Sequence, residues 1–327
     1  MPAAWYVTVG WVVVAIGNFA IATCQCGPWR GLRGSPRLFW PGAVGTAVSA
    51  VDSCGMTAML GRVSRRLTYA ARAAGAIVAA PREGTERVLE RIAGWRESHG
   101  EWSYEPAPSG EADVHAAINV DWPCAGCTEF GEVWSAALSE VAAGGLQVGR
   151  GAYGGWDDAD PRLARLVWCV ARNLRPERVL ETGVARGLTT RCLLEALDRN
   201  QRGHLWSIDL PPLIERGLAD QTGAAVPQRL QGRWTLIRGS SRRRLPGLLR
   251  DLGTLDMFVH DSMHTARNVR FELDRAWPVL TPGGVVAIDD VERNSATRDF
   301  LRAHPGVTAS IMAAEDGRAL IGCLVKD

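Results

Sequence analysis

The chain has 327 residues, a formal net charge of +2 and 46% hydrophobic residues, which suits one large globular domain with an appended region. The balanced charge argues against nucleic acid or another polyanion as a partner. Lys326 is the only lysine, so the many arginines reflect a compositional bias, and we interpret the run Arg242-Arg243-Arg244 as a solvated loop.

The first 58 residues form a hydrophobic segment that differs from the rest of the chain. Residues 3–24 contain no charged side chain and are long enough to cross a bilayer as one helix. Arg30, Arg33 and Arg37 follow, which by the positive-inside rule places the remainder of the chain in the cytoplasm. Two interpretations stay open: a single membrane anchor with membrane contact through residues 3–24, or an over-extended gene start upstream of Met59.

Residues 59–154 predict a helical and irregular cap region. Apolar residues at helical spacing indicate a helix from Leu67 to about Trp95, and a shorter helix is expected at 130–141. Cys124 and Cys127 form a Cys-x-x-Cys pair. A structural zinc site needs four ligands, and His115 offers only a third, so a plain loop is preferred over zinc or redox chemistry.

Residues 155–327 alternate between apolar strands and amphipathic helices, as a doubly wound parallel sheet requires. Asp160-Pro161 is a helix start, with an N-capping acid before a proline. A strand at 179–181 ends at Glu181, and the turn containing Gly183 and Gly187 then leads into a helix. Glycines let the backbone approach a ligand closely, and the helix N-terminus offers free N–H groups.

Polar side chains follow the next strands at the edge where such sheets bind ligands. The strand at 204–210 places Asp209 where a carboxylate can accept hydrogen bonds from ribose hydroxyls, and the strand at 234–238 leads to Ser240 and Ser241. Two further strands, 255–261 and 284–290, end in carboxylates. These acids are Asp261, Asp289 and Asp290.

Three carboxylates that converge in one crevice repel one another and stay ionised only beside a cation. Hard oxygen ligands favour Mg²⁺ or a similar divalent cation. His264 lies three residues after Asp261, and its ordinary pKa suits a general base at neutral pH. The alternative interpretation is structural: Asp289 and Asp290 would cap the next helix, Asp261 would hold a loop, and His264 would be a surface residue.

Two strand-like runs, 307–314 and 318–326, flank the turn Asp316-Gly317 at the C-terminus. A terminal hairpin of this kind adds one antiparallel strand to the sheet. The fold class is therefore α/β, a doubly wound and mostly parallel seven-stranded sheet with a C-terminal antiparallel hairpin and an N-terminal helical or irregular extension.

The spacing E-x-G-x-x-x-G from Glu181 to Gly187 differs from the G-x-G-x-x-G of dinucleotide-binding domains. It resembles the first motif of class I S-adenosylmethionine (SAM) methyltransferases. The resemblance covers roughly residues 155–327, the expected SAM-binding methyltransferase domain, and implies SAM as cofactor. It assigns Gly183 and Gly187 to the methionine part of SAM, Glu181 to the loop or the amino group, Asp209 to the ribose, and Ser240 or Ser241 to the adenine.

The acids after the fourth and fifth strands resemble the metal site of catechol-type O-methyltransferases. The pattern departs at Asp290, where that family has Asn, and at His264, where it has Lys. Asp-x-x-His at this place also resembles small bacterial tailoring methyltransferases. The resemblance implies metal-assisted O-methylation of a small molecule. The alternatives are a hydroxylase-type tailoring enzyme of the same fold, a membrane-tethered scaffold without activity, and a nicotinamide-dependent dehydrogenase, which the glycine spacing disfavours.

Overall fold

The computed structural model describes most of the chain after the first 70 residues. The described residues are 71–72, 74–75, 77–97, 103–107, 110–154, 157–210, 217–314, 317 and 319–327. The chain divides into two units, residues 1–72 and 73–327, and the second unit contains all the helices and strands given below.

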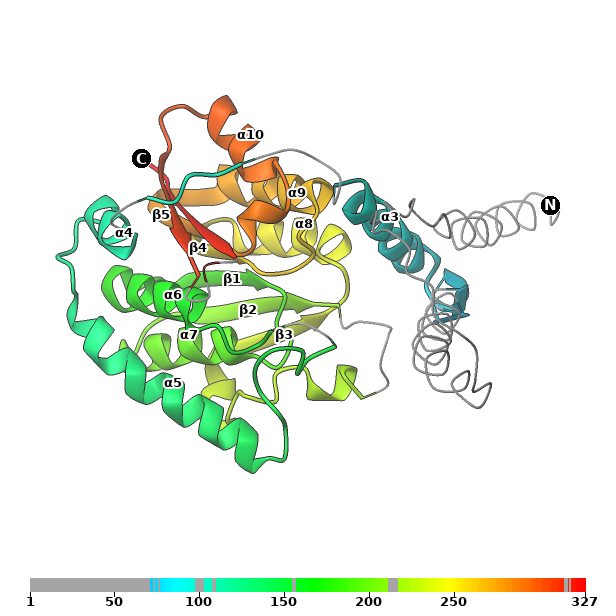
Figure 1. Cartoon of the computed structure of the whole chain (residues 1–327), viewed down its shortest axis with the longest axis horizontal. Helices are drawn as coiled ribbons and strands as arrows, with labels where there is room; N and C mark the ends of the chain where they lie inside the picture. Colours follow the sequence, from blue (N-terminus) through cyan, green and yellow to red (C-terminus); the bar gives the residue numbers. More distant parts are fainter. Residues whose placement is uncertain are drawn as a thin grey trace, which may run out of the picture. The chain divides into compact units, whose positions relative to one another are not determined.

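The described helices and strands of this unit alternate along the chain (Figure 1). Three helices come first: α3 (Pro81–Glu97), α4 (Glu111–Ala117) and α5 (Ala125–Ala143). The alternating part then runs α6 (Pro161–Leu174), β1 (Arg178–Thr182), α7 (Leu188–Arg199), β2 (His204–Asp209), β3 (Trp234–Arg238), α8 (Ser241–Leu252), β4 (Leu255–His260), α9 (Ala266–Ala276), β5 (Leu280–Ile288), α10 (Ala296–Ala303), β6 (Thr308–Ala313) and β7 (Leu320–Val325). Four short 3-10 helices lie between them: η1 (Ala219–Gln221), η2 (Gln228–Arg233), η3 (Trp277–Val279) and η4 (Val291–Arg293).

Within the described residues, seven strands form one sheet in the order β3-β2-β1-β4-β5-β7-β6. The first five strands of this order are parallel, and β7 runs antiparallel to both β5 and β6. The predicted sheet, including its terminal hairpin, is confirmed. Chain order reverses between β1 and β4, so this is the switch point at which open α/β sheets form a ligand crevice.

Side chains of successive strand residues point to opposite faces of the sheet, and each face has its own apolar core. Met257 and Val259 of β4 pack into the core formed with α6 and α7, whereas Phe258 packs into the core formed with α8, α9 and α10. Figure 1 shows these two layers of helices, with α5 lying outside α6 and α7. The central strands are thus buried on both sides, as their continuous apolar sequence requires.

The predicted helix start at Asp160-Pro161 is confirmed, because the Asp160 carboxylate accepts a hydrogen bond of 2.8 Å from the Arg162 backbone N–H. One expectation was wrong. The arginine run at 242–244, interpreted as a solvated loop, forms the first turn of α8 and is engaged by acids of α3.

Helix α3 is attached to the domain by its polar residues. Glu90 is buried, whereas Leu89, Ile92 and Trp95, which recur at helical spacing, are 40%, 43% and 49% exposed. None of the helices in the described part of the chain has both the length and the apolar character needed to cross a bilayer. Residues 3–24, where an anchor is predicted, lie outside the described residues.

Candidate active site

The loops that follow β1, β4 and β5 are aligned by hydrogen bonds that continue the sheet past its strand ends. The backbone N–H of Gly183 donates to the carbonyl of Ile208, and the N–H of Asp261 donates to that of Thr182, over 2.9 and 2.8 Å. The N–H of Asp289 donates to the carbonyl of His260 over 2.9 Å. The residues predicted from sequence are therefore brought to one edge of the sheet, on both sides of the switch point.

Gly183 lies where the β1 and β4 loops touch. Its φ is +86°, and a Cβ atom at this position would lie 1.8 Å from the carbonyl oxygen of Asp261. A side chain is excluded there for both reasons. Gly187, with φ +85°, is the N-cap of α7, and a Cβ there would come within 3.2 Å of Gly223 Cα. The glycine spacing is thus explained by close backbone approaches on either side of the loop.

Glu181 is fully buried at the end of β1, beside the start of α7. Its Oε2 accepts hydrogen bonds from Thr190 and Ser207 over 2.8 and 2.7 Å, and its Oε1 has no hydrogen-bond partner in the described part of the chain. Burial raises the pKa of Glu181 to about 7, and the negative charge of Asp209 adds to the effect, although the two hydrogen bonds oppose it.

Asp209 and Ser240 face the same crevice from β2 and from the loop after β3. Asp209 Oδ1 accepts from the Val184 N–H over 3.0 Å, while Oδ2 lacks a hydrogen-bond partner among the described residues. Burial raises the pKa of Asp209, against the opposing effect of the backbone hydrogen bonds. The Ser240 hydroxyl also lacks a described partner, whereas the Ser241 hydroxyl donates to Asn268 over 3.3 Å. Of the two predicted serines, Ser240 is therefore the one left for a ligand.

Asp261, Asp289 and His264 form a compact group after β4 and β5. One ligand atom of each lies within 4.8 Å of the other two. Burial raises the pKa values of both aspartates well above their usual range. The negative charge of Glu181 raises the pKa of Asp261 further, and the negative charge of Asp261 raises the pKa of Asp289 further. The Asp261 side chain is 32% exposed, so solvent moderates its shift.

Asp290 is oriented differently from the other two acids. Its φ of +51° puts it in the left-handed region, and its Oδ2 lies 2.5 Å from Arg293 Nε and 3.7 Å from His264 Nε2. The predicted third metal ligand is therefore paired with an arginine and with the predicted base. Burial lowers the pKa of His264 to about 4, although the charge of Asp290 opposes the shift.

A buried polar cluster behind the β4 loop was not predicted as a functional element. His260 Nδ1 donates to Glu272 Oε2 over 2.7 Å, and the same oxygen accepts from Thr182 over 2.6 Å. Burial favours the neutral acid, but the charge of His260 and these hydrogen bonds outweigh it and lower the pKa of Glu272 to about 2. Ser262 also donates to Glu272, over 3.0 Å, so the cluster fixes the residue next to Asp261.

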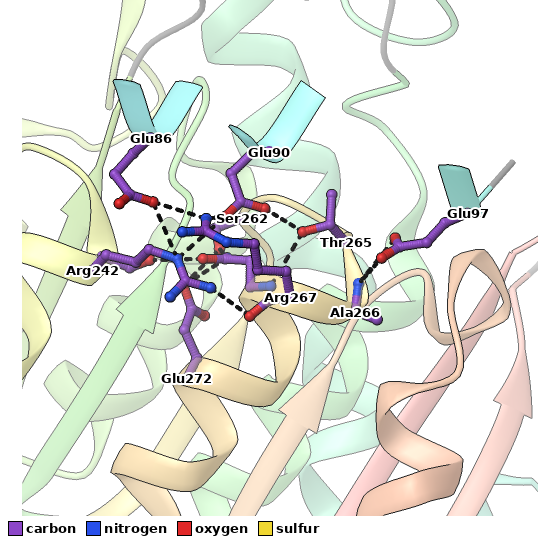
Figure 2. A network of polar contacts seen from close by, with 11 residues as sticks. Glu86, Glu90, Glu97, Arg242, Ser262, Thr265, Ala266, Arg267 and Glu272 are labelled. Atoms are coloured by element: carbon purple, nitrogen blue, oxygen red, sulfur yellow. Dashed lines mark hydrogen bonds and ion pairs between the residues drawn. The ribbon is translucent and has the colours of Figure 1, made fainter. Parts of the chain in front are cut away.

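Helix α3 holds the start of α9, directly after His264 (Figure 2). Glu90 accepts from the Thr265 hydroxyl and pairs with Arg267, and Glu97 accepts from the Ala266 N–H over 3.0 Å. Figure 2 shows Glu86, Glu90 and Glu97 pointing from one helix toward these residues and toward Arg242. The helical spacing of the acids could have indicated that this face of α3 contacts the domain. The apolar residues of the same segment show the same spacing, and they suggested the opposite face.

A second contact of α3 reaches the proposed adenine side. Glu83 accepts from the Ser240 N–H over 3.3 Å and pairs with Arg243. On the opposite side of the crevice, the buried Arg186 of the glycine loop bonds to Asp158 and to the carbonyl of Ala152. Segments before the sheet therefore hold the loops at both ends of the site.

Residues 180–291 match the model of a family described as a methyltransferase domain. The sheet order and the terminal hairpin are those of the predicted SAM methyltransferase fold, and the family match lies within this sheet, which supports the expected class I SAM-dependent methyltransferase. No curated protein matches the sequence.

The solved structures that are similar to the chain at low identity include two O-methyltransferases. The O-methyltransferase from Bacillus cereus in complex with SAH is 18% identical, with a TM-score of 0.45, over 60% of this chain and 91% of that one. The O-methyltransferase TomG from Streptomyces achromogenes, involved in tomaymycin synthesis and in complex with SAM, is 21% identical, with a TM-score of 0.44, over 60% and 90%. At these values neither likeness bears on the substrate of this chain.

Proposed function

We propose that the domain binds SAM in the crevice at the switch point and methylates a hydroxyl group of a small molecule, assisted by a divalent cation. The observation that carries the proposal is a set of buried polar atoms at this edge without hydrogen-bond partners in the described part of the chain. They are Glu181 Oε1, Asp209 Oδ2, Ser240 Oγ and His264 Nδ1. Buried polar atoms are nearly always paired in folded proteins, so a polar ligand is the natural partner for this set.

SAM matches the chemistry of the first three atoms. Its ammonium group and ribose hydroxyls are donors, which suits the free carboxylate oxygens of Glu181 and Asp209, and its adenine can meet the Ser240 hydroxyl. The closely approached backbone at Gly183 and Gly187 would accommodate the methionine part. The positive charge of SAM would also favour the ionised forms of Glu181 and Asp209, whose pKa values are raised by burial.

Asp261 and Asp289 are the residues that would hold the cation, because two carboxylates with raised pKa values gain most from a nearby positive charge. A bound divalent cation lowers the pKa of a hydroxyl group that it contacts. The residues fit such an ion without Asp290, which would have to leave Arg293 to join them.

His264 is the proposed general base. Its lowered pKa keeps the imidazole neutral near pH 7, so it can accept a proton. Its Nε2 faces Asp261 and Asp290 at 3.9 and 3.7 Å, which favours the tautomer with the proton on Nε2 and leaves Nδ1 as the acceptor. Asp290 then orients the ring and stabilises the imidazolium that forms. Methyl transfer itself requires mainly that the two reactants be held in line.

Titration calorimetry of SAM into the full chain tests the cofactor assignment. We expect Asp209→Asn to weaken SAM binding roughly tenfold or more, since a hydrogen bond to a charged group contributes about 1.5–3 kcal/mol. Asp299→Asn is the matched control, because Asp299 lies on α10 and pairs with Arg270. Absence of SAM binding by the folded wild-type protein would contradict the proposal.

The metal assignment is tested separately by Mn²⁺ binding, followed by electron paramagnetic resonance, in wild type, Asp289→Asn and Asp299→Asn. We expect Asp289→Asn alone to lose the bound Mn²⁺ while retaining its affinity for SAM. Transfer of a labelled methyl group to a panel of small phenols and sugars should be lost in the same variant. Unchanged Mn²⁺ binding and turnover in Asp289→Asn would rule out the metal role.

A further inference from the structure

Four sulfur and nitrogen donors meet at a place that takes no part in the proposed reaction. Cys124 is the N-cap of α5, Cys127 lies in its first turn, Cys169 is in α6 and His115 is in α4. One ligand atom of each lies within 4.8 Å of the other three. The sequence offered only three of these residues as neighbours, because Cys169 is 42 positions from Cys127.

We propose that His115, Cys124, Cys127 and Cys169 bind one Zn²⁺ in a structural site with four protein ligands. Three thiolates and one imidazole are an established donor set for structural zinc, and four protein ligands leave no open position for substrate. The site differs in chemistry from the group at Asp261 and Asp289, which offers mainly carboxylate oxygens.

The spacing of the donors suits a tetrahedral ion. Zn–S bonds of about 2.3 Å and Zn–N bonds of about 2.0–2.1 Å place tetrahedral ligand atoms roughly 3.6–3.8 Å apart. Here the Cys127 sulfur lies 3.4 Å from that of Cys124, 3.5 Å from that of Cys169 and 3.9 Å from His115 Nε2. These three separations differ from the tetrahedral values by a few tenths of an ångström, which small side-chain rotations can supply.

The imidazole of His115 is already oriented for metal binding. Its Nδ1 lies 2.7 Å from the carbonyl oxygen of Glu111, which can only accept, so the proton is on Nδ1. The lone pair of Nε2 is then directed toward the sulfur of Cys127. The ring is 1% exposed and packs edge-on against Trp122 at 4.6 Å between centroids. A hydrogen bond from the non-ligating nitrogen is the usual support of a metal-binding histidine.

Burial and surrounding contacts favour zinc over a redox role for the Cys-x-x-Cys pair. Cys169 is fully buried and Cys124 is 6% exposed. A dithiol that cycles with a disulfide needs an accessible attacking sulfur. It has no use for a third thiol or an oriented imidazole, and both are present here. The backbone between the two cysteines is also fixed, because Trp168 Nε1 donates to the carbonyl of Gly126 over 2.8 Å.

A zinc ion at this place would join three helices that come from different parts of the chain. Helices α4 and α5 precede the sheet, whereas α6 packs directly on it. The metal would therefore fasten the region before the sheet to the methyltransferase core. Zinc binding at a structural site contributes directly to folding stability, so removal of the ion should loosen this attachment.

The first test measures zinc in the purified full chain by mass spectrometry, after dialysis against a weak chelator. We expect one equivalent in the wild type, its loss in Cys169→Ser, and its retention in Cys192→Ser, a matched change of a buried cysteine in α7. A wild-type protein without zinc whose Cys124 and Cys127 form a disulfide would overturn the proposal, as would retention of the full equivalent in Cys169→Ser.

A second test does not require any variant to fold. Cobalt titrated into the metal-free wild-type protein should give the intense visible bands of a tetrahedral ion together with sulfur-to-cobalt charge transfer. Carboxylate ligands at Asp261 and Asp289 cannot produce the charge-transfer bands, so the signal reports the cysteine site alone. Absence of these bands at one equivalent of cobalt would refute the assignment.

Discussion

Glu181 is a buried acid whose replacement by glutamine should stabilise the free protein and weaken its binding of SAM. The side chain is fully buried, and its pKa is raised from 4.5 to about 7. Between these values the folded chain holds a proton that the unfolded chain has released. The folded state therefore binds more protons, and the free energy of unfolding falls as the pH rises through this window.

The size of the effect follows from the shift. One pKa unit corresponds to 1.36 kcal/mol, so ionised Glu181 lowers stability by roughly 3 kcal/mol at about pH 8 and by less than about 1 kcal/mol at about pH 5. Glutamine is nearly isosteric, and its carbonyl oxygen can still accept from Thr190 and Ser207. We expect Glu181→Gln to be more stable than the wild type by about 2–3 kcal/mol at the higher pH and by little at the lower one.

Urea unfolding of the unliganded protein at the two pH values measures this difference. Glu177→Gln is the control, because Glu177 is half-exposed, pairs with Arg202 at the surface and should change stability by less than about 1 kcal/mol. Calorimetry should show that Glu181→Gln also binds SAM more weakly, since the amide bears no charge for the ammonium group. Equal stabilities of variant and wild type at the higher pH would refute the reasoning about burial.

Three further substitutions probe the site and its supports. Gly183→Ala should lose at least about 2 kcal/mol of stability, because its Cβ would lie 1.8 Å from the Asp261 carbonyl at a φ of +86°; near-wild-type urea unfolding would contradict this. Glu272→Gln should lower the free energy of unfolding by about 3 kcal/mol, because it leaves His260 without its charged partner. This loss of stability should be complete above about pH 4.5. It should disappear as the pH falls through about 2, where Glu272 of the folded wild type becomes protonated. Glu90→Gln should lower kcat and leave the affinity for SAM unchanged. The reason is that Glu90 contacts Thr265, the residue after His264, and contacts no predicted SAM ligand. A loss of SAM affinity with unchanged kcat would contradict this prediction.

The sheet and its ligand-binding edge could be predicted because their signals are local. Apolar runs of strand length that end in Glu181, Asp209 or Asp261 carry their own evidence of secondary structure, and parallel strands bring their carboxyl ends to one edge. The order of the strands was enough to predict that each of these residues lies at that edge. The catalytic or binding role of each residue stays a prediction, because that role depends on what its side chain contacts.

The supports of the site could not be predicted because they join residues that are distant in sequence. Glu90 and Arg267 are 177 positions apart, and a segment with equally spaced apolar residues gave no reason to expect its acids to be buried. Asp290 shows a different failure: its left-handed backbone turns the carboxylate toward Arg293, and a pattern of acids does not specify such a turn.

The raised pKa values of Asp261 and Asp289 would couple the proposed cation binding to proton release. Burial and the neighbouring carboxylates raise the pKa of each acid, so without a cation the pair holds protons to a higher pH than free aspartates do. A divalent cation must displace those protons, and its affinity should therefore increase with pH. In the proposed mechanism the half-buried His264, whose pKa is lowered, would accept the proton of the substrate. On the proposed function, the grouped carboxylates at this edge would favour both a cation and the positively charged methyl donor.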